Sequence, residues 1–202
     1  MLTAQQVKDC AIRGGADLCG IASVERFKDE PPETHPLSLF PDAKSVIVYA
    51  SRILKGSYQG IREGTDWSTY WIYGYGSGIY SALGGATEAI SALLEDHGYE
   101  AVASPGGHTL LDEAPPAREP LGKDRLPPCV MLHMRLSAAL AGLGELGWSK
   151  VFLTPEFGPR QRFDILLTDA ELEPDPLLEQ PVCDGCQACV RHCPGKALGG
   201  AR

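Results

Sequence analysis

Apolar residues recur along the chain with spacings that predict both helices and strands. At the N-terminus, Thr3 to Gln6 has the sequence of a helix capping box, and the pair Gly14-Gly15 predicts where that first helix ends. A second, longer helix is predicted to end at Gly98. Its apolar face consists of residues spaced three or four positions apart or adjacent to one another: Ile79, Ala82, Leu83, Ala86, Ile90, Leu93 and Leu94.

Short apolar runs predict the strands. Residues 45–50, Ser-Val-Ile-Val-Tyr-Ala, are apolar on both faces, which is typical of a central strand in a covered sheet. Residues 16–22 and 99–104 predict two further strands. Residues 149–154 and 161–168 are predicted to form a hairpin, because the connection between them contains two prolines and a glycine.

The order of these elements predicts the organisation of the chain. Helices alternate with strands over residues 1–170, which indicates an α/β domain. Within it, residues 105–128 contain six prolines and form a long connection, which is typical of a lid, a binding loop or disorder. An acidic, proline-marked linker at 169–176 then leads into a second, smaller segment, 177–202.

That second segment carries the strongest chemical signal in the sequence. Four cysteines, Cys183, Cys186, Cys189 and Cys193, lie within eleven residues, and Pro194 follows the last of them. Gaps of two, two and three residues are the bacterial ferredoxin spacing for a [4Fe–4S] cluster. A structural zinc site is the main alternative, but zinc ribbons separate their two cysteine pairs by a long loop. A redox dithiol is the other alternative.

Composition narrows the classes of protein that remain. The formal net charge of −8 argues against a nucleic-acid surface. Arg160 and Arg162 could belong to a local basic patch, but a solvated strand end is the better interpretation of these two residues. No apolar run approaches membrane-spanning length, and the first residues lack the pattern of a secretory signal. Seven cysteines, an odd number, do not predict a disulfide framework. We therefore expect a cytoplasmic protein with no membrane partner.

Three other features leave alternatives open. Gly142, Gly144 and Gly147 match the letters of a dinucleotide fingerprint, but they follow a predicted helix and precede a strand, which is the wrong context. A tight turn that lets a flat ligand or another strand approach closely is the better interpretation. The aromatic residues between 67 and 80 predict either a cofactor pocket or a core or subunit interface. Cys129 is interpreted as a small buried residue, with a catalytic or ligand role as the alternative.

Several segments resemble the corrinoid iron–sulfur reductases, a family that includes epoxyqueuosine reductase and the reductive dehalogenases. The resemblance is strong over residues 137–194 and weaker over 14–50. The segments that carry it are 141–147 (Ala-Gly-Leu-Gly-Glu-Leu-Gly), 153–160 (Leu-Thr-Pro-Glu-Phe-Gly-Pro-Arg), 167–169 (Leu-Thr-Asp), the cysteine motif, and the N-terminal segments 15–22 and 40–48.

The resemblance implies a nitroreductase-like α/β domain that holds a cobalamin, followed by a ferredoxin-like domain with two clusters. It also implies that a ferredoxin or flavodoxin supplies electrons, which pass through the clusters to cobalt. By the same resemblance, the turn that contains Gly142, Gly144, Glu145 and Gly147 borders the corrin pocket and is the expected cofactor-binding site.

The sequence departs from the family pattern in four respects. The tRNA-modifying reductases carry an acidic proton donor where this chain has Pro128-Cys129, so epoxyqueuosine reduction is in doubt. A twin-arginine leader and an Asp-x-His-x-x-Gly segment are both absent. Nine residues follow Cys193, with no second cysteine run. We therefore expect a shortened ferredoxin-like segment; the alternatives are that Cys193 returns to the same cluster or that a distant cysteine such as Cys129 completes it.

The leading hypothesis is an iron–sulfur oxidoreductase that passes electrons through a [4Fe–4S] cluster to a corrinoid, or directly to a substrate, in the α/β domain. Its substrate is not assigned by the sequence. The alternative is a non-catalytic electron-transfer or cluster-binding subunit that docks on a partner protein.

Overall fold

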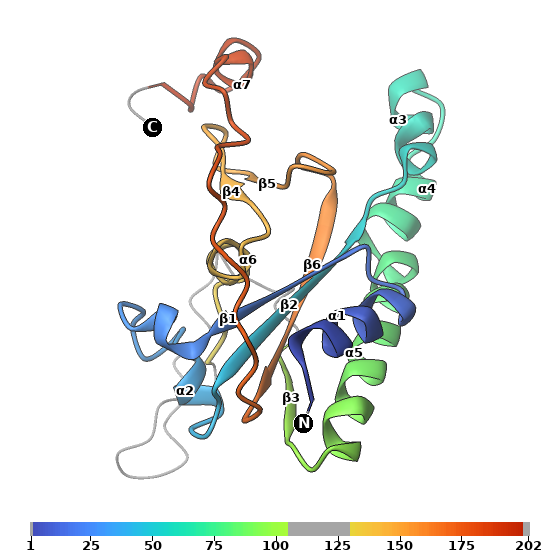
Figure 1. The fold of residues 1–202 in the computed structure, drawn as a ribbon. Coiled ribbons are helices and arrows are strands. Elements are labelled where there is room, and N and C mark those ends of the chain that lie inside the picture. Colours follow the sequence, from blue (N-terminus) through green and yellow to red (C-terminus); the bar gives the residue numbers. More distant parts are fainter. Residues whose placement is uncertain (1, 105–129, 200–202) are drawn as a thin grey trace, which may run out of the picture.

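A four-stranded antiparallel sheet forms the centre of the molecule (Figure 1). The computed structural model describes residues 2–104 and 130–199. The strand order is β1 (Leu18–Ser23), β2 (Ser45–Arg52), β6 (Gln161–Thr168) and β3 (Ala101–Ser104). The eight-residue strand β2 pairs with β1 on one side and β6 on the other, and seven of its residues are buried. The predicted central strand is thus confirmed.

Two helices, α1 (Ala4–Arg13) and α5 (Ser77–Asp96), cover one face of this sheet (Figure 1). The predicted capping box at Thr3 is present, and its side chain accepts the backbone N–H of Gln6. The chain after α1 lies directly against α5, because a Cβ on Gly14 would sit 2.7 Å from the Cα of Ala86. The core of this face joins both helices to β1, β2 and β6, and includes Val7, Ile21, Ile47, Leu83, Ile90 and Leu166.

The opposite face is covered by α6 (Met134–Leu140) and by a small two-stranded sheet of β4 (Glu145–Leu146) and β5 (Phe152–Leu153). Its core is a second cluster, which includes Ala22, Val48, Ala138, Phe152, Phe163 and Ile165. The rings of Phe152 and Phe163 meet edge to face, with centroids 5.2 Å apart, and join the small sheet to β6. Helices on both faces of a sheet make a mixed α/β fold, as predicted.

Short helices fill the remaining connections. α3 and α4 extend away from the sheet at the start of α5 (Figure 1), and α7 carries part of the cysteine motif. The short helices that fill these connections are η1 (Val24–Phe27), α2 (Pro36–Leu39), η2 (Lys55–Tyr58), α3 (Gln59–Glu63), α4 (Ser68–Tyr70), the π-helical turn η3 (Trp71–Tyr75) and α7 (Ala188–Arg191).

The predicted hairpin between 149–154 and 161–168 is wrong. β5 pairs with β4, whereas β6 pairs with β2 and β3 in the main sheet. A turn does form between them, and an isolated bridge joins Thr154 to Gly158. Beyond this turn the chain enters the main sheet, because the alternating apolar residues of β6 are buried between the two helical layers.

Two predictions lie outside the described residues: the connection at 105–128 and the role of Cys129. The structure therefore does not test either of them. In the ranges that are described, every helix is too short or too polar to cross a membrane.

Candidate functional site

The segment that follows β6 runs back along the domain towards the cysteine motif, and it is fixed by hydrogen bonds at each stage. Ser45 Oγ donates to the carbonyl of Ala170 at 2.8 Å and accepts the N–H of Leu172 at 3.0 Å. Further along, Asp175 is bonded to the backbone of Ile21 and to Lys8. The segment predicted as a linker is thus packed onto the α/β domain as far as residue 175.

The glycines predicted to form a tight turn lie where this segment crosses the end of α6. Gly142 has a left-handed backbone (φ +76°), and a Cβ there would overlap the carbonyl oxygen of Pro176. A Cβ on Gly144 would overlap the carbonyl oxygen of Leu153, and one on Gly147 would come within 2.7 Å of the Leu153 side chain. Gly142 and Gly144 therefore allow the chain's own backbone to approach closely, and Gly147 allows the Leu153 side chain to do so.

Glu145 and Trp148, from the same turn, hold the first cysteine of the motif. The Cys183 N–H donates to Glu145 Oε1 at 2.7 Å, and the N–H of Trp148 donates to Cys183 Sγ at 3.4 Å. Glu145 is itself fixed, because its backbone pairs with Leu153 in the small sheet. The predicted cofactor turn and the predicted cluster motif are therefore in direct contact.

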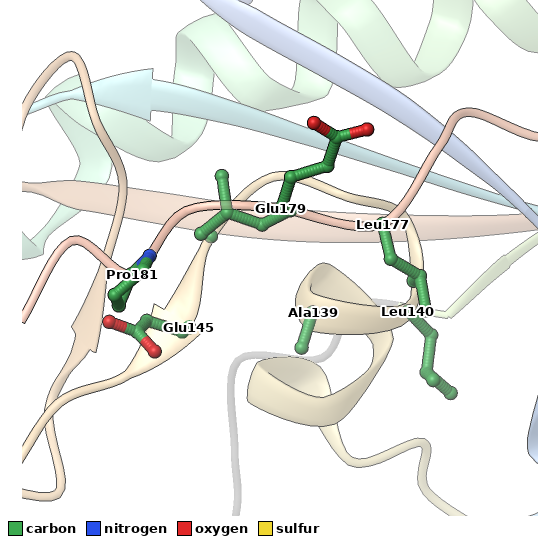
Figure 2. Close-up of a pocket in the computed structure, with 8 residues that line it drawn as sticks. Ala139, Leu140, Glu145, Leu177, Glu179 and Pro181 are labelled. Atoms are coloured by element: carbon green, nitrogen blue, oxygen red, sulfur yellow. The ribbon is translucent and has the colours of Figure 1, made fainter.

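A cavity of about 390 Å³ lies between α6, this turn and residues 177–181 (Figure 2). Leu140 and Leu177 lie at one end of it, and Glu145 and Pro181 at the other (Figure 2). Its lining combines apolar residues with Glu145 and Glu179, and the carboxylate of Glu179 points away from α6 (Figure 2). Its volume is at the lower end of the range for small-molecule sites, so it can accept a small ligand or one edge of a larger cofactor.

The remaining cysteines of the motif lie in an irregular segment. Cys186 is exposed, and its N–H donates to Asp184 Oδ1 at 3.0 Å, a bond that holds the pKa of that carboxyl below its ordinary range. Cys189 is in α7, and Cys193 Sγ accepts the N–H of Ala197 at 3.4 Å. Gly185 and Gln187 have left-handed backbones (φ +75° and +58°), which turn the chain sharply between successive cysteines.

These cysteines fit an iron–sulfur cluster by the chemistry of their donors. All four are free thiols, and two of them already accept backbone N–H groups, as cluster ligands do. Their sulfurs are not gathered, since residues 2–104 and 130–199 contain no group of three His, Cys, Asp or Glu side chains arranged to hold a metal ion. The four-cysteine ligand set therefore remains a prediction.

The aromatic residues of 67–75 are largely exposed, so this part of the predicted aromatic group is not in the core. Trp67 is 67% and Trp71 54% exposed, and Tyr73 and Tyr75 are similar. Arg162 anchors the segment to β6. Its Nε donates to the carbonyl of Gly74 at 3.2 Å, and its guanidinium lies over the ring of Tyr75. Arg162 is therefore a packing residue as well as a cation at the end of a strand.

Cys10 and Cys19 belong to the opposite face of the sheet, between α1 and α5. Cys10 Sγ donates to the carbonyl of Ala89 at 3.3 Å. Burial, and then the nearby carboxylate of Asp175, raise the pKa of Cys19 to about 12. Burial likewise raises the pKa of Tyr49, whose hydroxyl is bonded to Thr87. Cys19 and Tyr49 therefore stay protonated at neutral pH, and both are structural.

Sequence reasoning missed two contributors to this site, Trp148 and Asp175. Trp148 acts through its backbone N–H, which carries no signal in the sequence. Asp175 was included only as part of an acidic linker. Its position two residues before the cavity-lining residue Leu177 becomes meaningful only when the chain path is known.

Comparison with known proteins shows where similar sequences and folds occur. No family model matches the chain. A tetrachloroethene reductive dehalogenase of Sulfurospirillum multivorans is 34% identical over 82 residues, which is 39% of this chain and 16% of that protein. One of Desulfitobacterium hafniense is 41% identical over 64 residues, 30% of this chain and 12% of that protein.

Solved structures match the chain over almost its whole length. An epoxyqueuosine reductase superposes with a TM-score of 0.67 at 17% identity, covering 96% of this chain and 52% of that one. A reductive dehalogenase described as B12-dependent superposes with a TM-score of 0.63 at 19% identity, covering 96% of this chain and 25% of that one.

This chain therefore spans about half the length of the epoxyqueuosine reductase and a quarter of the dehalogenase. The proteins that it resembles are reductases. The predicted resemblance to the corrinoid iron–sulfur reductases is confirmed: in fold to epoxyqueuosine reductase and the reductive dehalogenases, and in sequence to the reductive dehalogenases.

Proposed function

We propose that this chain is part of an iron–sulfur oxidoreductase, in which a nitroreductase-like domain at 1–170 holds the reacting cofactor and a ferredoxin-like segment at 177–202 holds a [4Fe–4S] cluster. The observation that carries this proposal is the contact between the two parts. Four free cysteines at ferredoxin spacing begin with Cys183, and that residue is bonded to the turn at Glu145 and Trp148.

In this proposal Cys183, Cys186 and Cys189 bind the cluster, and Cys193 is a fourth metal ligand, either of this cluster or, as in two-cluster ferredoxins, of a second one. The neighbours of these cysteines orient them. Trp148 directs its N–H at the Cys183 sulfur, and Ala197 does the same for Cys193. Asp184 restrains the backbone between Cys183 and Cys186. When bound, the cluster supplies one-electron transfer between an external donor and the site in the α/β domain.

The proposed reacting cofactor is a cobalamin, supported by the likeness to a dehalogenase described as B12-dependent. A corrinoid exceeds the drug-sized ligands that a cavity of about 390 Å³ accommodates, so the described residues fit one edge of it. Gly144 and Glu145 line that cavity, whereas Gly142 and Gly147 shape the turn that carries them. When bound, the corrinoid would supply the reduction of substrate.

The electron donor proposed for this site is a protein of the ferredoxin or flavodoxin class. Cys186 is exposed, so a cluster held by the motif would lie at a surface that such a donor can approach. The proposed location is the cytoplasm.

Anaerobic reconstitution with iron and sulfide tests the proposal. We expect a brown protein that contains iron and acid-labile sulfide in equal amounts. Cobalamin binding is measured on the same sample by calorimetry. Stoichiometric zinc with no sulfide would overturn the cluster, whereas a cluster-replete sample that binds no cobalamin would overturn the corrinoid and leave an electron carrier.

The ligand set is tested separately with Cys193→Ala. If Cys193 serves a second cluster that this chain lacks, the variant should retain the iron and sulfide of the wild type. If the substitution abolishes an otherwise stable cluster, Cys193 is the fourth ligand of the same cluster and the shortened-segment interpretation is wrong.

A further inference from the structure

We infer that Glu145 is a positioning residue for the iron–sulfur cluster: it fixes the backbone of Cys183, and its negative charge lowers the reduction potential of the cluster that Cys183 binds. The inference rests on the proposed function, in that it requires Cys183 to be a cluster ligand.

The first step is that the backbone of Glu145 belongs to the folded α/β domain. Glu145 lies in β4, where its backbone pairs with Leu153, and the preceding Gly144 packs so closely on Leu153 that a Cβ would not fit. The bond from the Cys183 N–H to Glu145 Oε1, at 2.7 Å, therefore joins the cysteine to a paired strand of that domain.

The second step is that Cys183 is hydrogen-bonded to the turn through both its backbone N–H and its sulfur. Its N–H donates to Glu145 and its sulfur accepts from Trp148 N–H, three residues further along the same turn. By contrast, the hydrogen bonds found for Cys186 and Cys193 within the described ranges join them to their own segment. The structure thus ties the motif to the α/β domain through its first cysteine.

The third step is electrostatic. A carboxylate accepts an N–H more strongly than a neutral amide does, so a glutamate is a good anchor. The same charge also acts on the cluster. A negative charge close to the ligand disfavours the extra electron of the reduced cluster, which lowers its potential, whereas the N–H that Trp148 donates to the sulfur raises it.

Two substitutions separate the anchor from the charge. Glu145→Gln keeps an oxygen that can accept the Cys183 N–H but removes the charge; Glu145→Ala removes both. We expect Glu145→Gln to retain the iron and sulfide content of the wild type while its midpoint potential shifts to a more positive value. We expect Glu145→Ala to lose cluster content.

The control is Glu171→Gln, which changes the net charge equally. Glu171 is exposed and lies three residues after the last residue of β6, Thr168. That end of β6 is the one farther from α7 (Figure 1). Its potential and its cluster content should match the wild type. A merely structural role for Glu145 would leave the potential of Glu145→Gln unchanged, and that result would overturn the electrostatic part of the inference.

Positioning is also tested without a cluster. In metal-free protein, hydrogen exchange at the Cys183 amide should be slow in the wild type and in Glu145→Gln, and faster in Glu145→Ala. Equal exchange in all three proteins would overturn the anchoring role. If the wild type takes up no iron and sulfide, the proposed function fails, but this exchange measurement still decides whether Glu145 positions Cys183.

Discussion

Asp175 and Ile21 exchange a pair of hydrogen bonds: the N–H of Asp175 donates to the Ile21 carbonyl at 2.8 Å, and the N–H of Ile21 donates to Asp175 Oδ2 at 2.9 Å. The other carboxylate oxygen of Asp175 meets Lys8 Nζ at 2.6 Å. Helix α1, strand β1 and the segment leading to the cysteines are therefore joined at one carboxylate.

The first prediction concerns this junction. Asp175→Ala should lower the free energy of unfolding by about 1–3 kcal/mol, because it leaves the Ile21 N–H and the Lys8 ammonium without their partner. Urea unfolding measures the change. Glu173→Ala is the control, because Glu173 is an exposed acid on the same segment. An equal loss in both variants would mean that the junction contributes nothing specific.

The second prediction concerns the turn at Gly144. Gly144→Val should destabilise the fold by about 1–3 kcal/mol, because its side chain would overlap the Leu153 carbonyl and separate β4 from β5. Gly84→Ala is the matched control: Gly84 is in α5 with open space at its Cβ, so alanine should stabilise the helix by about 0.5–1 kcal/mol. Thermal unfolding should show lower stability than the wild type for Gly144→Val and higher stability for Gly84→Ala. Unchanged stability of Gly144→Val would contradict the close packing at this turn.

Local signals in the sequence predicted most of the fold. The capping box at Thr3, the doubly apolar strand at 45–50 and the long amphipathic helix each depend on residues close in sequence, and the structure confirms them. The hairpin at 149–168 was wrong, because its prolines and glycine specify a turn but not which strand pairs with which. The antiparallel order of the sheet is likewise decided by long-range packing.

The candidate site, like the fold, has some features that a local sequence pattern predicts and others that depend on long-range contacts. The spacing of the four cysteines is a local pattern and could be read directly, whereas the bond from Cys183 to Glu145 joins residues 38 positions apart. The glycines were recognised as permitting a close approach. Which backbone approaches, that of Pro176 or of Leu153, depends on the path of the folded chain and leaves no trace in the sequence.

The third prediction concerns Arg162 and the exposed aromatic segment. Arg162→Lys should release this segment, because an ammonium cannot bond Gly74 and Tyr70 while also covering the ring of Tyr75. Near-ultraviolet circular dichroism should lose intensity, since Trp71 packs on Tyr75 with ring centroids 5.4 Å apart. Arg160→Lys, two residues earlier and exposed, should leave the spectrum unchanged. Identical spectra for the wild type and Arg162→Lys would contradict the anchoring role.

The fourth prediction concerns the pH dependence of stability. Because burial raises the pKa of Cys19 to about 12, the folded protein keeps a proton that the unfolded chain releases above about pH 8.5. The unfolded state then binds fewer protons than the folded state, so stability falls as pH rises, by at most about 1.4 kcal/mol per pH unit from this group.

The comparison with Cys19→Ala isolates Cys19, because Tyr49 and Tyr80, whose pKa values burial also raises, titrate in both proteins. Urea unfolding of the wild type and of Cys19→Ala at a series of pH values measures the effect. Between pH 6 and 8 the two should differ by a constant amount, which is the packing cost of the smaller side chain. Above pH 9 that difference should shrink, because only the wild type has a thiol at this position to titrate. A constant difference up to pH 10 would mean that the Cys19 thiol titrates alike in the folded and unfolded protein.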